Sequence, residues 1–246
     1  MDVTQHQTEI LENEKHWRRK PILQTIYHRF HQEIAGHLSE LELPLVVELG
    51  SGIGNIKDVI PHALRTDLFP NPWLDQTENA YKLSFADETV SDLILFDVFH
   101  HLRYPGAAFR EFRRVLRPGG RVLVFDPFIS LFGVFVYKAL HHEPINWRQE
   151  IEWNAPKGWD PSQLDYYAAQ GNATRVFFSR LTYTLFKDWI IVTRKRYSAF
   201  AYVASGGYSG PQLYPDRFYP QLSSLENLMD KIPILFATRI LAVIQK

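Results

Sequence analysis

The residues best suited to hold a ligand are four polar side chains, each placed where a short apolar run ends. They are Glu48, Asp67, Asn79 and Asp97. Short apolar runs bounded by turn residues are typical of buried parallel strands. Open α/β sheets bind ligands beyond the carboxyl ends of such strands, so we expect the four side chains to meet at one edge of a sheet.

A glycine turn lies directly after the first of these strand ends. It contains Gly50, Ser51, Gly52 and Gly54. A dinucleotide-binding turn would have the spacing Gly-x-Gly-x-x-Gly and would place a pyrophosphate at a helix N-terminus. The spacing here is Gly-x-Gly-x-Gly, and the nearby carboxylates favour a ligand with an ammonium group, a sulfonium group and a ribose diol. The missing Cβ of Gly52 would let the backbone approach that ligand, and Asp67 could accept both ribose hydroxyls.

Two histidines, His100 and His101, follow the strand end at Asp97. A histidine can act as a general base where an acceptor must lose a proton. The pair therefore supplies the candidate catalytic residues. The alternative is that these histidines pack and hydrogen-bond behind the sheet.

Residues 141–163 form a polar, Trp-rich segment that we interpret as a loop or lid. His141, His142 and Glu143 offer a further base there. Because adjacent histidines point in different directions and rarely share an ion, we expect no metal site. Three tryptophans of the segment either line an acceptor pocket or pin the segment to the core. They are Trp147, Trp153 and Trp159.

Hydrophobic periodicity predicts the elements that position these residues. Helices are expected over residues 21–41, 55–60, 105–116, 128–140 and 166–186. Strands are expected over residues 45–49, 63–67, 91–96, 121–125, 188–193 and 235–244, the last at an edge of the sheet. Residues 68–78 are too few for a crossover helix, so an ordered loop is expected there, and its Asp75 competes with Asp67 for the ribose. Strands that alternate with helices predict an α/β fold with a mostly parallel, roughly seven-stranded sheet and helices on both faces.

The composition narrows the class of protein. The chain has 246 residues, 27 basic and 27 acidic side chains, and no Cys. A neutral chain argues against nucleic acid as the main partner, since such proteins usually carry a basic stripe. The first twenty residues lack the apolar core of a signal peptide, and the apolar stretch 129–140 is too short to span a bilayer. The expectation is a cytoplasmic protein without a transmembrane segment.

Four ordered segments resemble the motifs of class I S-adenosylmethionine (SAM)-dependent methyltransferases. They are Val47–Gly54, Asn79–Asp92, Asp97–Leu102 and Arg114–Arg121. The resemblance implies a Rossmann-like methyltransferase sheet and SAM as the cofactor. It places Glu48 and the Gly50–Gly54 turn against the methionine moiety and Asp67 at the ribose. It also places Asn79 at the adenine amino group, Ala80 near the adenine ring, and Asp97 closest to the transferred methyl.

These observations predict an N-terminal helical cap, residues 1–43, followed by a SAM-binding domain, residues 44–246, with an insertion or lid at about 128–187. The predicted activity is methyl transfer to a small-molecule, glycan or lipid-linked acceptor. Two alternatives stay open at this point: an NAD-dependent oxidoreductase and a SAM-binding module without catalysis.

Overall fold

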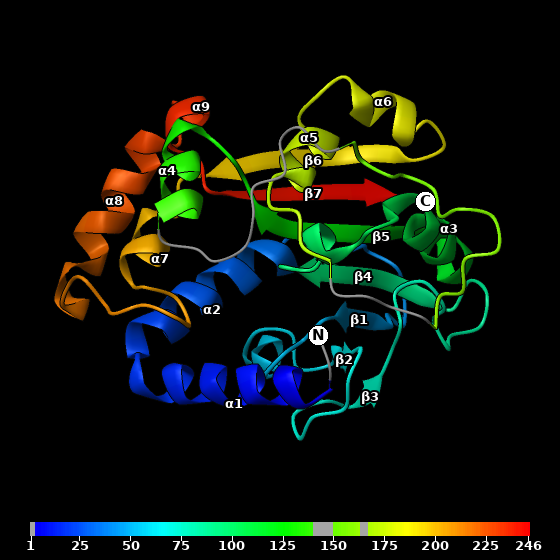
Figure 1. Ribbon diagram of the computed structural model, residues 1–246, viewed down its shortest axis with the longest axis horizontal. Helices are drawn as coiled ribbons and strands as arrows, with labels where there is room; N and C mark the ends of the chain where they lie inside the picture. The colour runs from blue at the N-terminus through cyan, green and yellow to red at the C-terminus, as the bar shows by residue number, and fades with distance from the viewer. Residues whose placement is uncertain (1–2, 140–149, 163–166) are drawn as a thin grey trace.

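The computed structural model describes residues 3–139, 150–162 and 167–246. Its centre is a seven-stranded sheet with the order β3-β2-β1-β4-β5-β7-β6 (Figure 1). The strands are β1 (Val46–Leu49), β2 (Leu64–Asp67), β3 (Gln76–Thr77), β4 (Val90–Phe96), β5 (Leu116–Pro127), β6 (Ile190–Tyr197) and β7 (Arg239–Gln245). Within the described ranges, no helix combines the length and apolar character needed to cross a membrane.

The strands from β3 to β5 are parallel, and β7 and β6 complete the sheet in antiparallel pairings. Strand order reverses between β1 and β4, which creates the switch point where open α/β sheets bind ligands. The predicted mostly parallel, seven-stranded sheet is therefore confirmed.

The last strand is internal, so the prediction of an edge strand at residues 235–244 was wrong. β7 pairs with β5 on one side and β6 on the other, and every residue of it except Gln245 is buried. A strand buried on both faces has a continuous apolar sequence, as Ile240–Ile244 has, and that signal favoured an internal position. The predicted strand also began too early, because residues 235 and 236 belong to helix α9 (Pro233–Phe236).

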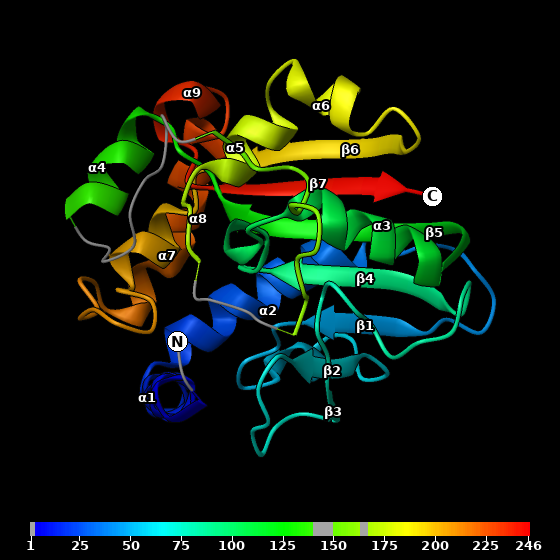
Figure 2. The ribbon, with the colours of Figure 1, turned by 45° about the vertical axis from the view of Figure 1, so that its right-hand side comes forward.

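Helices cover both faces of the sheet, as predicted. Helix α2 (Pro21–Ala35) buries its apolar stripe against one face. On the other face, α3 (Pro105–Val115) and α5 (Asn172–Phe177) pack with the core, and α6 (Leu181–Leu185) follows them (Figure 2). The remaining α-helices are α1 (Val3–Arg19), α4 (Leu131–Ala139), α7 (Phe200–Ala204), α8 (Tyr219–Met229) and α9, and most of them gather at the carboxyl end of the parallel strands (Figure 1).

Four predicted helices are shorter than expected. The helix predicted over 21–41 ends at Ala35, directly before Gly36. Residues 55–58 form one 3-10 turn, because Pro61 follows closely. The helix predicted over 166–186 is two short helices: Gly171, with a φ of 101°, precedes α5, and residues 178–180 separate α5 from α6. The helix predicted over 128–140 begins only at Leu131. Between β2 and β3 there is a loop without a crossover helix, as the short spacing predicted.

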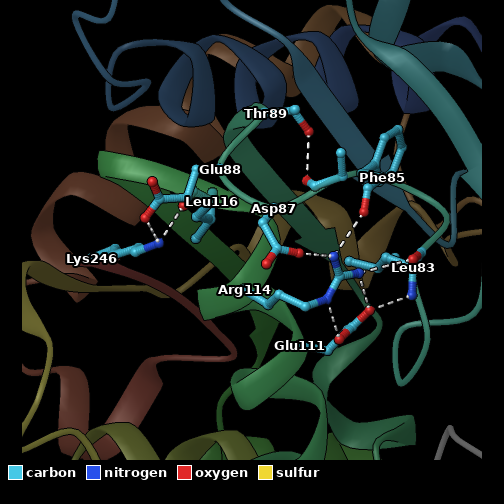
Figure 3. Close-up of polar contacts among 10 residues, drawn as sticks. Leu83, Phe85, Asp87, Glu88, Thr89, Glu111, Arg114, Leu116 and Lys246 are labelled. Atoms are coloured by element: carbon cyan, nitrogen blue, oxygen red, sulfur yellow. Dashed lines mark hydrogen bonds and ion pairs between the residues drawn. The ribbon is translucent and has the colours of Figure 1, made fainter.

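A polar network fixes the segment that leads into β4 (Figure 3). Arg114 of α3 donates to the carbonyl oxygens of Leu83 and Phe85 at 3.0 and 2.9 Å and pairs with Asp87 at 2.6 Å. Glu111 binds the same guanidinium and accepts from the Leu83 amide at 2.8 Å. Arg114 therefore holds the loop between Asn79 and β4 in place.

Candidate functional site

A cavity of about 1560 Å³ opens at the carboxyl ends of the parallel strands. Its walls come from β1, β2, β4 and the segments that follow them, together with α1, α2 and the loop after α7. Ten of the predicted site residues line it: Glu48, Gly50, Ser51, Gly52, Asp67, Asn79, Ala80, Asp97, His100 and His101. Gly54, the eleventh, is not part of the lining.

The three glycines of the turn have different structural requirements. All have positive φ, at 70° for Gly50, 53° for Gly52 and 69° for Gly54. A Cβ on Gly50 would lie 2.3 Å from Val98, and one on Gly54 would lie 2.7 Å from Arg65. Among the described residues, a Cβ on Gly52 would meet only Ile10, at 3.6 Å, and would otherwise point into open space. Gly50 and Gly54 are thus needed for packing, whereas Gly52 leaves room for a ligand.

Glu48 is a buried carboxyl group at the end of β1. Its Oε2 has no hydrogen-bond partner among the described residues. Burial raises the pKa of Glu48 to about 7, and the nearby Asp67 carboxylate adds to the effect. A buried anion without a counter-ion is costly, so Glu48 is well suited to a ligand that brings positive charge into the cavity.

Asp67 ends β2 and reaches the glycine turn. It accepts hydrogen bonds from the amides of Gly52 at 3.1 Å and Leu68 at 2.7 Å. Its rival, Asp75, is bound to Arg65 at 3.0 Å and to Lys57 at 2.9 Å, and it does not line the cavity. These cations hold the pKa of Asp75 well below its usual value. The geometry therefore favours Asp67 as the carboxylate that faces a ligand.

Asn79 lines the cavity but uses its side chain within the protein. Its amide donates to the Pro161 carbonyl at 2.8 Å, and its Oδ1 accepts from the Tyr81 amide at 2.9 Å. The side chain therefore shapes a turn next to Ala80 and fastens residues near 161 over it. Its assignment to the adenine amino group remains a prediction.

Asp97 follows β4 with a φ of 56°. Non-glycine residues rarely adopt this conformation, and Asp is one of those that tolerate it. Its amide donates to the Phe125 carbonyl at 2.8 Å, and its carboxylate pairs with the buried Arg239. The Arg239 guanidinium also lies over the Tyr202 ring, 4.7 Å from its centroid.

His100 forms a buried pair with Asp126. The His100 Nδ1 lies 3.0 Å from Asp126 Oδ1, and both side chains are almost completely buried. Burial raises the pKa of Asp126, while His100 opposes that rise. The neighbouring His101 has its Nδ1 2.9 Å from the Tyr167 carbonyl, to which it must donate. Both rings line the cavity.

Asp97, His100 and Asp126 have atoms that could bind a metal ion within 4.8 Å of one another. Among the described residues, this is the one such group of three. Asp97 already has Arg239 as its partner, and Asp126 has His100. Asp126 Oδ2 has no hydrogen-bond partner among the described residues. The cationic Arg239 beside Asp97 opposes the charge of a metal ion, so the cluster gives no support for a metal site.

The tryptophans of the insertion have different positions. Trp153 packs on Phe109 and Phe186 at 6.1 and 5.5 Å between ring centroids, and its carbonyl accepts from the Gly106 amide. Trp159 instead lines the cavity, in edge contact with the ring of Tyr81. Trp147, His141, His142 and Glu143 lie outside the described residues.

Sequence reasoning missed several residues of the cavity region. Asp126 is the penultimate residue of β5 and would have been found by the strand-end argument applied to the other strands. Arg239 interrupts the apolar sequence of the last strand. The cavity residues of α2, of α7 and of the loop after α7 give no comparable local signal. They include Tyr27, His31, Tyr202 and Tyr208.

The residues present fit SAM. The unpartnered Glu48 oxygen offers an anion for a cationic ligand, the open side of Gly52 leaves room for close approach, and Asp67 borders the same space. The cavity also exceeds the roughly 300–1,000 Å³ of an ordinary ligand site, which leaves space for a second reactant.

Comparison with known proteins agrees with this geometry. A family model described as "Methyltransferase domain" matches residues 57–124. No curated protein matches the sequence. Among solved structures, a putative SAM-dependent methyltransferase from Listeria monocytogenes is 12% identical with a TM-score of 0.50, over 90% of this chain and 98% of that one.

A second similar structure is geranyl diphosphate C-methyltransferase from Streptomyces coelicolor A3(2), crystallised with S-adenosyl-L-homocysteine. It is 10% identical with a TM-score of 0.50, over 90% of this chain and 75% of that one. At this identity the two structures show a shared fold. The family match, over residues 57–124, is to a methyltransferase domain and not to an NAD-dependent oxidoreductase. The chain therefore shares the fold of these methyltransferases and contains, over residues 57–124, a match to the methyltransferase-domain model.

Proposed function

We propose that this chain is a SAM-dependent methyltransferase that acts on a hydroxyl group of a small-molecule or glycan-like acceptor, with His100 as the general base. The observation that carries the proposal is the buried His100–Asp126 pair in the wall of the cavity. A base is useful only where the acceptor loses a proton on methylation. A hydroxyl does so, whereas a thioether or a tertiary amine does not.

The orientation of His100 supports this role. Its Nδ1–H donates to the Asp126 carboxylate, which leaves Nε2 as the nitrogen that can accept a proton. A buried carboxylate beside an imidazole fixes the tautomer and stabilises the imidazolium that forms, as in other acid–base sites. His101 has the same tautomer through Tyr167 but a carbonyl partner without charge, so it stabilises an imidazolium less.

SAM supplies an activated methyl group on a sulfonium. The chain's own contribution is to align the acceptor oxygen with that methyl and to take the acceptor proton at His100 Nε2. The O–CH₃ bond forms as the S–CH₃ bond breaks, its electron pair stays on sulfur, and the products are the methyl ether and S-adenosylhomocysteine. Alignment of two bound reactants supplies roughly 7–11 kcal/mol of such a barrier.

The lining also bears on the acceptor. Carboxylates outnumber cations among the residues around the cavity, and Arg239 and Arg103 are paired with Asp97 and Glu152. A strongly anionic acceptor would meet an unfavourable potential there. We therefore favour a neutral hydroxyl compound over a phosphorylated one.

The experiment is a methyl-transfer screen with isotope-labelled SAM and panels of phenols, sugars, sugar nucleotides, lipid alcohols, thioethers and tertiary amines, with S-adenosylhomocysteine as the readout. With the best acceptor, His100→Gln should lower kcat about 10²- to 10⁴-fold without a change in SAM affinity. His62→Gln, on the exposed turn before β2, is the control. Transfer only to thioethers or tertiary amines, or full activity of His100→Gln, would contradict the proposal.

A further inference from the structure

The loop Ser205–Pro211, which follows α7, forms one wall of the cavity. It is folded tightly on itself, with the Gly210 amide donating to the Gly206 carbonyl at 2.6 Å. Gly206 has a φ of 70°, and a Cβ there would lie 2.4 Å from the Pro211 carbonyl oxygen. The loop therefore has a defined shape that depends on its glycines.

Lys20 ties this loop to the N-terminal helices. It lies between α1 and α2, and its ammonium donates to the carbonyl oxygens of Ser205 at 3.1 Å, Gly207 at 2.6 Å and Gly210 at 2.6 Å. The side chain is buried, and burial lowers its pKa. A buried ammonium is tolerated only when it is hydrogen-bonded, and here its three donors meet three carbonyl groups of one loop. Lys20 thus fixes the loop relative to α1 and α2.

The fixed loop places Tyr208 beside the glycine turn. The Tyr208 hydroxyl accepts a hydrogen bond from Asn55 Nδ2 at 3.2 Å, and Asn55 directly follows Gly54. The Tyr208 ring packs against Tyr27, with 5.3 Å between ring centroids. The Tyr208 hydroxyl also forms a side-chain hydrogen bond with Tyr27. That bond and the one from Asn55 both lower the pKa of Tyr208, as expected when its oxygen is the acceptor, so its O–H remains a donor for a further group. Burial raises the pKa of Tyr208 well above its ordinary value, so that donor stays protonated.

The chemistry of these two side chains complements the rest of the site. SAM carries a carboxylate on its methionine moiety, and that group would be repelled by Glu48, Asp67 and Asp97. An amide N–H and a phenol O–H are neutral donors that bind a carboxylate without forming an ion pair with those residues. Arg239 is the competing donor, but Asp97 already neutralises it.

We propose that Asn55 and Tyr208 bind the methionine carboxylate of SAM, and that Lys20 is the positioning residue that holds Tyr208 there. The inference rests on the cofactor site described above. It adds to that site a hydrogen-bond donor from a distant loop, since Asn55 and Tyr208 are 153 residues apart in the sequence.

The test compares two ligands by calorimetry. S-Adenosylhomocysteine has the amino-acid moiety, whereas 5′-methylthioadenosine has the same nucleoside and sulfur but lacks it. Tyr208→Phe keeps the ring and removes the donor, so it should weaken S-adenosylhomocysteine about tenfold, as expected for a hydrogen bond to a charged group, and leave methylthioadenosine unchanged. Lys20→Met should show the same selectivity, and thermal melting verifies that each variant is folded.

The matched control is Tyr214→Phe. Its hydroxyl donates to the Ala201 carbonyl at 3.1 Å in the same region, and Tyr214 does not line the cavity. This variant should bind both ligands as the parent chain does. Equal losses for the two ligands in Tyr208→Phe would overturn the proposal, and so would unchanged affinity for S-adenosylhomocysteine. Failure of the parent chain to bind either ligand would instead contradict the cofactor assignment, so the two failures are distinguishable.

Discussion

The two halves of the molecule build the cavity in different ways. In residues 45–127, polar side chains stand at the ends of successive parallel strands, and the family match falls within this half. In the described part of residues 128–246, short helices alternate with loops, and both strands pair in antiparallel fashion, β7 with β5 and β6 with β7. The first half therefore presents its site through local sequence order, and the second half through contacts between distant segments.

This difference has a physical origin. The hydrogen bonds between parallel strands align their carboxyl ends. Glu48, Asp67 and Asp97 lie at or next to these ends, so they converge once the sheet forms. Tyr208 and Arg239 reach the same cavity only because Lys20 holds a loop and β7 enters the middle of the sheet. Substitutions at the glycine turn of the first half should therefore weaken cofactor binding directly. Substitutions in the second half should act through the packing of the segments that line the cavity.

The largest expected effect is that of Gly52→Val in the first half. Its φ of 53° disfavours a branched residue, and the added atoms would point into the space that a ligand needs. SAM affinity should fall more than about 100-fold, which corresponds to about 2.7 kcal/mol. Calorimetry with SAM and a thermal melt of the same sample measure the two consequences separately.

Gly50→Ala is the matching substitution at a glycine of the same turn that is needed for packing. An added Cβ would lie 2.3 Å from Val98, so this substitution should destabilise the fold itself. Normal SAM binding by Gly52→Val would show that the glycine turn is not part of the cofactor site. A Gly52→Val protein that fails to fold would show that the two glycines have the same structural role.

The sequence predicted the first half in detail because its signals are local. Strand ends, the glycine turn and the missing crossover helix all follow from patterns of a few residues. It predicted the second half poorly: α7 and α8 were not recognised, and β7 was placed at an edge. Short helices have weak periodicity and depend on tertiary packing. Tyr208 could not be predicted, since its position depends on Lys20 and Asn55.

A second prediction concerns how the segment around Trp153 is attached to the core. Trp153 packs on Phe109 and Phe186, next to Gly106, and does not line the cavity. Trp153→Ala should lower the free energy of unfolding by about 2–3 kcal/mol and leave SAM affinity unchanged. Chemical denaturation measures the first quantity and calorimetry the second. Unchanged stability together with weaker SAM binding would make Trp153 part of the site instead of an anchor.

The smallest expected effect is a pH dependence of SAM binding that comes from Glu48. Burial raises its pKa to about 7, and the ionised form attracts a sulfonium whereas the protonated form does not. SAM affinity should therefore rise with pH, by up to about tenfold per unit below pH 7, and level off above it. Glu48→Gln should remove this slope, and neutral 5′-methylthioadenosine should show little of it in the parent chain.

The same carboxyl group makes an independent prediction for the ligand-free protein. Because the pKa of Glu48 is higher in the folded chain than its ordinary value of 4.5, its contribution to stability is complete at low pH. That contribution is lost as the pH rises from 4.5 towards 7. The free energy of unfolding of Glu48→Gln should fall less over this range than that of the parent chain. A SAM affinity that is flat between pH 6 and 8, with the stability slope intact, would mean that Glu48 is buried as described but does not face the cofactor's charge.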